Sequence, residues 1–406
     1  MKIVYKFHCF FLHGTNRLIL LVFFLGLSCN KTKDYYEPII PLAIHHNGME
    51  YIGMESCVKC HKDIVENHKN TSHYNTSAVA SSKSIKGSFS DGENILGINH
   101  QTAFKMLISD TAFVQQLYLK ESNEILYTAP MQMVIGSGTK GQSFLVWDRD
   151  ALYQLQVSYF TPTDNWINSP GFPPKPVQVR PVPGRCLECH TTFAKRTDRY
   201  YDNRFDKKTL IYGIDCQRCH GDVKRHTLHH LEHPKDTIAK YILSFKDLNQ
   251  SQQLDACALC HSGIREKQIK DNFEFMLGDN LDKFSLPDYD ESSLYDLDVH
   301  GNQYGLLQAS ACFKRSEKMS CSTCHNPHKS NRGNANFFND ACVTCHGKDK
   351  VHNIAENALA KEFSNCISCH MPLTESNVMK IQVEADSLVA VKVRTHLIGI
   401  YDDINN

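Results

Sequence analysis

The alternation of hydrophobic and polar residues predicts β-strands in the first half of the chain. Residues 113–119 and 152–159 alternate in part with a period of two and are rich in aromatic and aliphatic side chains, which is typical of half-buried strands. Residues 135–138 hold two glycines and predict a turn between strand-like runs. Seven of the fourteen prolines fall within residues 162–183, which predicts an extended loop. We therefore expect a small antiparallel β module within residues 87–180.

The N-terminus has a basic start followed by an apolar run. Lys2, Lys6 and Arg17 precede residues 18–27, which are ten residues without a polar side chain. This is the length of the apolar part of a signal peptide and is too short to span a membrane. The run leads into the sequence Leu-Gly-Leu-Ser-Cys ending at Cys29, which resembles a bacterial lipobox, where the cysteine is lipidated. We expect a lipid on Cys29 to hold the protein on a membrane; the alternatives are an ordinary cleaved signal peptide or an uncleaved anchor.

The formal net charge is zero, so no overall field favours nucleic acid as a partner. The cysteines are the strongest indication of function, because fourteen of the seventeen lie in seven copies of the motif Cys-x-x-Cys-His (CxxCH). In this motif the two thiols attach a haem c covalently and the histidine becomes its proximal iron ligand. Zinc and redox-active thiols are the alternatives, but neither needs a histidine directly after every cysteine pair. The motifs are Cys57, Cys60 and His61; Cys186, Cys189 and His190; Cys216, Cys219 and His220; Cys257, Cys260 and His261; Cys321, Cys324 and His325; Cys342, Cys345 and His346; and Cys366, Cys369 and His370.

Seven covalent haems would supply much of the interior of a chain of 406 residues, of which only 41% are hydrophobic. We therefore predict a mainly α fold with little regular structure, organised around stacked c-type haems, plus the inserted small antiparallel β module. Haem c is attached outside the bacterial cytoplasm, so the chain is expected to be exported. Cys312 is interpreted as a small buried side chain or a thiol at a haem edge, and Cys9 would leave with the signal peptide.

Several short sequences resemble multihaem cytochromes c of the hydroxylamine oxidoreductase-like superfamily, a group that includes the tetrahaem electron acceptors of ammonia oxidisers. The resemblance is carried by the Ser-His pair ending at His73, by residues 135–138, by residues 166–172 and by Arg180-Pro181 ahead of the second motif. It implies a heptahaem c-type cytochrome in which irons take a second, distal histidine.

Distal ligands are expected among the histidines outside the motifs. The resemblance favours His73 after motif 1, His226 in the basic loop after motif 3, and His328 in the sequence CxxCH-x-Pro-His. The candidate distal ligands are His73, His226, His328, His396, His300 and His352. For the other histidines the role stays open. His45 and His46 are tether residues or ligands. His68, where many relatives have tryptophan, and His100 are interpreted as ordinary or surface histidines. The run of His229, His230 and His233 is a solvated segment, a source of one more ligand, or a separate metal site.

Iron held by two histidines suits electron transfer, and its surroundings tune its potential over roughly 0.8 V. We therefore expect an electron carrier between redox proteins of the cell envelope, membrane-anchored by its lipid and facing the periplasm or the cell surface. The alternative is a multihaem oxidoreductase that acts on a small nitrogen or sulfur species at one open haem. Its catalytic residues are unknown, because no CxxCK motif occurs and no tyrosine stands out. In a third interpretation, the β module is a docking domain for a protein partner.

These expectations divide the chain into a signal peptide (1–28), a lipid tether (29–50), a segment for haem 1 (51–86), the β-rich insertion (87–180), a segment for haems 2 to 4 (181–270), an acidic and aromatic linker (271–320), a segment for haems 5 to 7 (321–375) and a C-terminal β tail (376–406).

Overall fold

The computed structural model describes residues 38–110, 112–265, 267–347, 365–384 and 387–401. Two compact units divide the chain, Met1–Ile39 and Ile40–Asn406, and the description below concerns the second. The predicted signal peptide, Cys9, the lipidation site Cys29 and the candidate ligand His352 lie outside the described residues. Among those described, no helix is both long and apolar enough to cross a membrane.

The prediction of a mainly α fold is wrong. Within the described residues, eighteen strands form five sheets, and 27% of the chain is strand against 29% helix. The strands lie well beyond the expected β module, because segments from both ends of the chain add strands to the same sheet. Short two-stranded sheets also form before motif 1, between motifs 2 and 3, and between motifs 4 and 5.

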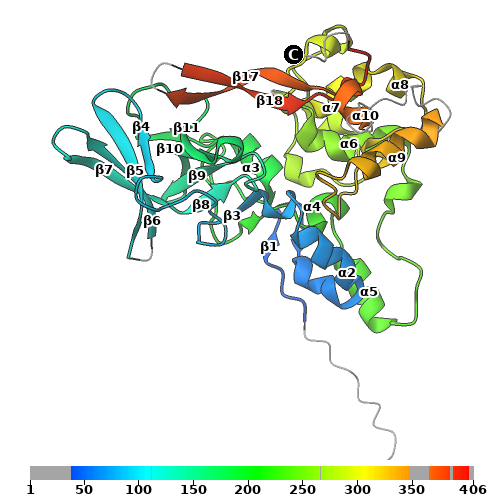
Figure 1. Ribbon diagram of the computed structural model, residues 1–406. Coiled ribbons are helices and arrows are strands. Elements are labelled where there is room, and N and C mark those ends of the chain that lie inside the picture. The colour runs from blue at the N-terminus through cyan, green and yellow to red at the C-terminus, as the bar shows by residue number, and fades with distance from the viewer. Residues whose placement is uncertain (1–37, 111, 266, 348–364, 385–386, 402–406) are drawn as a thin grey trace, which may run out of the picture. The chain divides into compact units, whose positions relative to one another are not determined.

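The large sheet has the strand order β18-β17-β11-β10-β9-β8-β3, with β12 paired to β10. Figure 1 shows β17 and β18 as a long hairpin beginning beside α10, and β17 reaches β11 through Asn168 and Gln382. Two of its strands, β11 and β12, fall inside the proline-rich stretch predicted as loop. The bounds are β3 Ser77–Val79, β8 Met133–Ile135, β9 Gly141–Asp148, β10 Ala151–Phe160, β11 Asn165–Asn168, β12 Val179–Pro181, β17 Leu373–Glu384 and β18 Ser387–Arg394.

A second sheet, of order β4-β5-β6-β7, packs against the large one. Phe104 and Leu117 from this sheet share a buried core with Phe144 and Leu155 from the large sheet. Gln115 is buried in the same region, where its amide group donates to and accepts from the backbone of Val157. The alternation at residues 113–119 thus corresponds to β6 of this sheet, and that at residues 152–159 corresponds to β10 of the large sheet. The bounds are β4 Ile95–Gly97, β5 Thr102–Ser109, β6 Ala112–Leu119 and β7 Ile125–Met131.

The helices are short, and most carry a CxxCH motif in a terminal turn. Two cysteines three positions apart lie on one face of a helical turn, so both thiols point to the same side. Side-chain caps begin three of these helices, from Asp215, Asn249 and Asn334. The α-helices of the described residues are α2 Val58–Lys69, α3 Gly184–His190, α4 Cys216–His220, α5 Lys224–Glu232, α6 Gln250–His261, α7 Gln303–Ala309, α8 Ala311–Lys314, α9 Ala335–His346 and α10 Cys366–His370.

Short strands and single 3-10 turns connect these helices. The remaining strand pairs are β1 Ala43–Ile44 with β2 Glu50–Tyr51, β13 Thr191–Phe193 with β14 Ile211–Tyr212, and β15 Lys267–Gln268 with β16 Ser285–Leu286. The 3-10 helices are η1 Met54–Ser56, η2 Tyr74–Thr76, η3 Thr161–Thr163, η4 Phe245–Asp247, η5 Asn272–Glu274, η6 Leu281–Lys283, η7 Glu291–Asp296 and η8 Cys321–Thr323, the last of which carries motif 5.

Candidate haem-binding cavity

All seven CxxCH motifs open on one continuous cavity of about 3480 Å³. All fourteen motif cysteines and all seven motif histidines line it. A site for a single small ligand has a volume of roughly 300–1,000 Å³, so this cavity has room for several large groups. Divided among the seven motifs, the volume is about 500 Å³ each, within that range for one ligand. The residues therefore fit a set of covalent haems that share one interior.

Seven further histidines also face this cavity. His68 is buried, which contradicts its interpretation as a surface histidine. His230 is the member of the histidine-rich run that reaches the cavity, whereas His229 bonds to Asp236 instead. His100 is exposed. The cavity-lining histidines outside the motifs are His68, His73, His226, His230, His300, His328 and His396.

Four of these histidines pair with a motif histidine at the spacing that a shared metal ion requires. When two imidazoles bind opposite sides of one metal ion, each metal–nitrogen bond is about 2.0 Å and each nitrogen lies about 1.1 Å from the centre of its ring. The two ring centres are then about 6.2 Å apart. Each imidazole is free to rotate about its metal–nitrogen bond, so the angle between the ring planes is not restricted. The four pairs are His61 with His226 (6.4 Å), His220 with His328 (6.1 Å), His261 with His73 (6.1 Å) and His325 with His396 (6.1 Å).

Hydrogen bonds prepare two of the histidines that line the cavity to act as ligands through Nε2. His226 Nδ1 lies 2.8 Å from the carbonyl oxygen of Lys240, and His370 Nδ1 lies 2.8 Å from that of Gly399. A carbonyl only accepts, so each ring carries its proton on Nδ1 and leaves the Nε2 lone pair for a metal.

Burial also keeps several of the histidines neutral, as metal ligation requires. Desolvation by the surrounding protein lowers the pKa of His73, of His190 and of His396 to about 4. At pH 7 these three imidazoles are therefore uncharged before any metal binds.

The motif cysteines show which attachment points are neighbours. The thiols of Cys57 and Cys216 lie beside each other, which places motif 1 next to motif 3. Three further thiol pairs place motif 2 next to motif 4, motif 4 next to motif 5, and motif 6 next to motif 7. These pairs are Cys189 with Cys260, Cys257 with Cys321, and Cys342 with Cys366.

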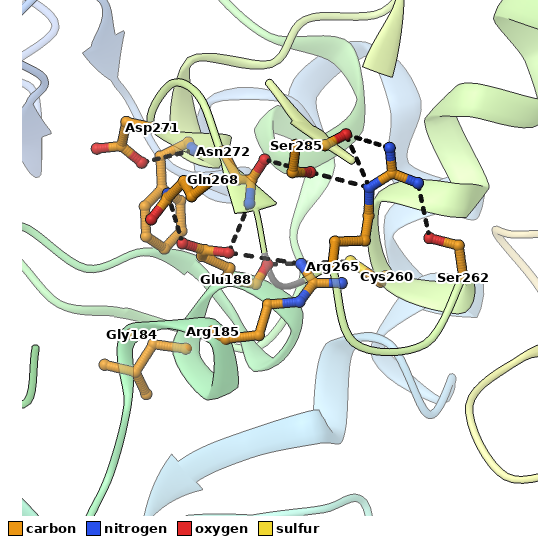
Figure 2. Close-up of polar contacts among 12 residues, drawn as sticks. Gly184, Arg185, Glu188, Cys260, Ser262, Arg265, Gln268, Asp271, Asn272 and Ser285 are labelled. Atoms are coloured by element: carbon orange, nitrogen blue, oxygen red, sulfur yellow. Dashed lines mark hydrogen bonds and ion pairs between the residues drawn. The ribbon is translucent and has the colours of Figure 1, made fainter. Parts of the chain in front are cut away.

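A buried carboxylate inside motif 2 fixes the position of α3. Figure 2 shows the Glu188 side chain among Arg185, Gln268 and Asn272. The Nη1 atom of Arg185 lies 3.5 Å from one oxygen, Asn272 Nδ2 donates to the same oxygen at 2.7 Å, and Gln268 Nε2 donates to the other at 3.1 Å. Arg196 Nη2 adds a contact of 3.3 Å. The carboxylate is thus surrounded by donors, which offsets the cost of its burial.

Motif 3 fixes the segment before motif 1 through its first variable residue. The buried side chain of Gln217 accepts from the backbone N–H groups of Ile52 and Gly53, at 2.6 and 3.1 Å. Its amide nitrogen donates to the carbonyl oxygen of Glu50 at 2.9 Å. Sequence reasoning missed both Gln217 and Glu188; polar residues between the two cysteines of a motif are the signal that points to them.

The large sheet supplies a polar wall to the same cavity. Ser143 on β9 and Ser158 on β10 line the cavity, and their hydroxyl groups are 2.9 Å apart. His190 of motif 2 also lies near the sheet, since its Nδ1 is 2.6 Å from the hydroxyl of Thr76 before β3. Among the described residues, His190 belongs to none of the histidine pairs.

His45 and His46, for which both a tether and a ligand role were left open, are absent from the cavity lining and form a cluster with Asp271 that has the composition of a metal site. The backbone N–H of Asn47 donates to His45 Nδ1 at 3.2 Å, so the ring proton lies on Nε2. That nitrogen faces Asp271 Oδ2 at 3.5 Å. With Nε2 protonated and Nδ1 already accepting, His45 offers no lone pair, and the cluster is a histidine–aspartate pair.

Comparisons with known proteins agree with this geometry. Residues 176–221, which hold motifs 2 and 3, match the family model described as cytochrome c554 and c-prime. The fold resembles the crystal structure of the outer cell wall cytochrome OcwA, with a TM-score of 0.53 and 15% sequence identity over 86% of this chain and 79% of that chain. A search of the curated proteins finds no match. The family match supports c-type cytochrome character for the stretch that holds motifs 2 and 3, and the structural match shows a similar fold.

Proposed function

We propose that this chain is a c-type cytochrome with seven covalently attached haems that carries electrons between redox partners outside the cytoplasm. The observation that carries the proposal is the common cavity of the seven motifs, within which four motif histidines face a second histidine at 6.1–6.4 Å. When bound, haem c supplies one-electron chemistry at its iron.

The chain's own residues hold the attachment points in a fixed order. The thiols of Cys57 and Cys216 lie beside each other, so motif 1 adjoins motif 3. His73, from the segment after motif 1, also reaches His261 of motif 4. Motif 4 also adjoins motifs 2 and 5. The two histidines of each pair would together hold the iron of a bound haem and leave no position for a substrate, which favours outer-sphere electron transfer over catalysis at those four motifs.

The test is the mass of the mature holoprotein together with its absorption as the pyridine complex. We expect seven haems for each polypeptide and no zinc. Cys312→Ala serves as a control, because Cys312 lies outside the motifs and its loss should leave the haem count unchanged. A native count below seven, or stoichiometric zinc in place of covalent haem, would contradict the proposal.

A second candidate function is an oxidoreductase acting on a small nitrogen or sulfur species. It is favoured by motif 2, where His190 (like His346 of motif 6) has no partner histidine among the described residues and lies 2.6 Å from the hydroxyl of Thr76. The same large cavity also has the hydroxyl groups of Ser143 and Ser158 in its wall. Low-temperature EPR with spin counting separates the two functions. If every iron is low-spin and unmoved by nitrite or hydroxylamine, the protein is a carrier; one high-spin iron that shifts with either ligand makes it an enzyme.

We further propose that the protein is exported and held on a membrane by a lipid on Cys29, facing the periplasm or the cell surface. The signal-like N-terminus supports this location, as does the likeness to a cytochrome whose name places it in an outer cell wall. Its partners would then be other redox proteins of the cell envelope.

A further inference from the structure

The second variable residue of motif 3 is a buried arginine. Arg218 is only 5% exposed. Its Nε and Nη2 atoms donate to the carbonyl oxygen of Glu188 at 3.3 and 3.0 Å, and Nη1 donates to that of Asn272 at 3.1 Å. The guanidinium also lies over the ring of Phe273, 5.0 Å from its centre. Three hydrogen bonds and a ring contact therefore fix the position of this charge.

Every hydrogen-bond acceptor of the Arg218 guanidinium among the described residues is a backbone carbonyl. The buried carboxylate of Asp215 accepts from the backbone N–H of Gln217 and makes no ion pair with Arg218. The carboxylate of Glu188, whose own backbone carbonyl binds Arg218, already faces Arg185 and Arg196 on its two oxygens. Figure 2 shows that carboxylate turned towards its own donors. Arg218 is thus a fixed positive charge in the protein interior, where screening by water is weak.

The charge lies where three motifs meet. The carbonyl oxygen of Glu188 that binds Arg218 is also 3.9 Å from the sulfur of Cys260. Arg218 directly precedes Cys219, and the Cys260 thiol that shares its carbonyl partner lies beside the thiol of Cys189. Arg185 adds positive charge near Cys189 and Cys260, whereas the carboxylate of Asp215 opposes Arg218 at Cys219. Cys189, Cys219 and Cys260 are the second cysteines of motifs 2, 3 and 4, so one guanidinium lies beside the attachment edge of three haems.

We propose that Arg218 raises the reduction potentials of the haems at motifs 2, 3 and 4. Reduction of one haem adds one electron and no atom, and a nearby fixed cation stabilises the more negative state. The inference rests on the proposed function, because it requires haems at these three motifs.

The test is a spectroelectrochemical titration of the holoprotein and of three variants. Arg218→Met removes the charge, and we expect about three sevenths of the absorbance change to move to lower potential. Arg218→Lys keeps the charge and should leave most of the curve in place. Arg199→Met is the matched control, because Arg199 is an exposed arginine that contacts Tyr200, and its curve should superimpose on that of the wild type.

A titration of Arg218→Met that superimposes on the wild type while seven haems are retained would overturn the proposal. Equal shifts in the Met and Lys variants would also overturn it, because they would assign the effect to packing. If Arg218→Met fails to take up its haems, Arg218→Gln replaces it, since glutamine keeps a donor for the Glu188 carbonyl. A wild-type count below seven haems refutes the proposed function, whereas seven haems without an effect of Arg218 refute this inference alone.

Discussion

Replacing Gly213 by alanine should both destabilise the protein and disturb one histidine pair. Gly213 has a φ of +67°, and an added Cβ would lie 2.1 Å from the carbonyl oxygen of Tyr74. A left-handed backbone costs a residue with a Cβ about 1–2 kcal/mol, and overpacking costs about 1–3 kcal/mol more, so the total is about 2–5 kcal/mol. Tyr74 follows His73, and Ile214 N donates to the carbonyl oxygen of His73 at 2.9 Å. Relief of the clash should displace the Tyr74 carbonyl and with it the adjacent His73, so we expect the spacing of His73 to His261 to change.

Gly48→Ala is the matched control for this prediction. Gly48 has a φ of +90° but nothing lies within 4 Å of its ideal Cβ, so alanine there carries the backbone cost of about 1–2 kcal/mol alone. Thermal unfolding followed by circular dichroism compares the two variants, and EPR counts low-spin iron. If Gly213→Ala is no less stable than Gly48→Ala, the clash argument is wrong. If it is less stable but every low-spin signal is kept, the assignment of His73 as an axial ligand is wrong.

Three further changes test other parts of the structure. His328→Met should keep all seven haems, change the spectrum of one iron and raise its potential, whereas His100→Met, at an exposed histidine, should change neither. The hydroxyl groups of Ser292 and Ser293 lower the pKa of Asp290 to about 2, so the stabilising effect of its carboxylate is present above pH 3.8 and is lost as the pH falls towards about 2. Asp290→Ala should therefore unfold at a lower temperature than the wild type at pH 7, and this difference in unfolding midpoint should disappear between pH 3.8 and about pH 2. Cys29→Ala should release the protein from membranes into the soluble fraction, and continued sedimentation with membranes would rule out lipid as the anchor.

The sequence predicts local features of this fold and fails on the distant ones. The strand at Ala112–Leu119 follows from its alternation, because that pattern depends only on which face of the strand is buried. The addition of β17 to the large sheet depends on the pairing of Asn168 with Gln382, more than two hundred residues apart, and periodicity carries no information about pairing partners. Strands of two or three residues, such as β13, are too short to show a period at all. The mainly α expectation failed because it assigned these segments to irregular chain.

The same limit applies to the candidate site. The spacing within each CxxCH motif is local, so the attachment points are evident from the sequence. The pairing of His61 with His226 joins residues from different parts of the chain, and the sequence around each residue carries no information about its partner. His68 was missed as a residue of the cavity, and the member of the histidine-rich run that reaches it, His230, was not singled out, because burial here depends on how the seven motifs are placed in space.

A single stretch of eight residues explains how three motifs come to share one region without a large core between them. Within residues 213–220, Gly213 bonds to Ser77 through its backbone N–H, and Gln217 holds the backbone that leads into motif 1. Arg218 holds the backbone of motif 2 and the loop at Asn272. Each of these contacts ends on a backbone group or a short side chain, so each fixes a distance more tightly than the packing of flexible apolar side chains would. Attachment points fixed in this way keep their spacing whichever redox state the bound groups adopt, and constant spacing is what transfer of electrons between neighbouring sites requires.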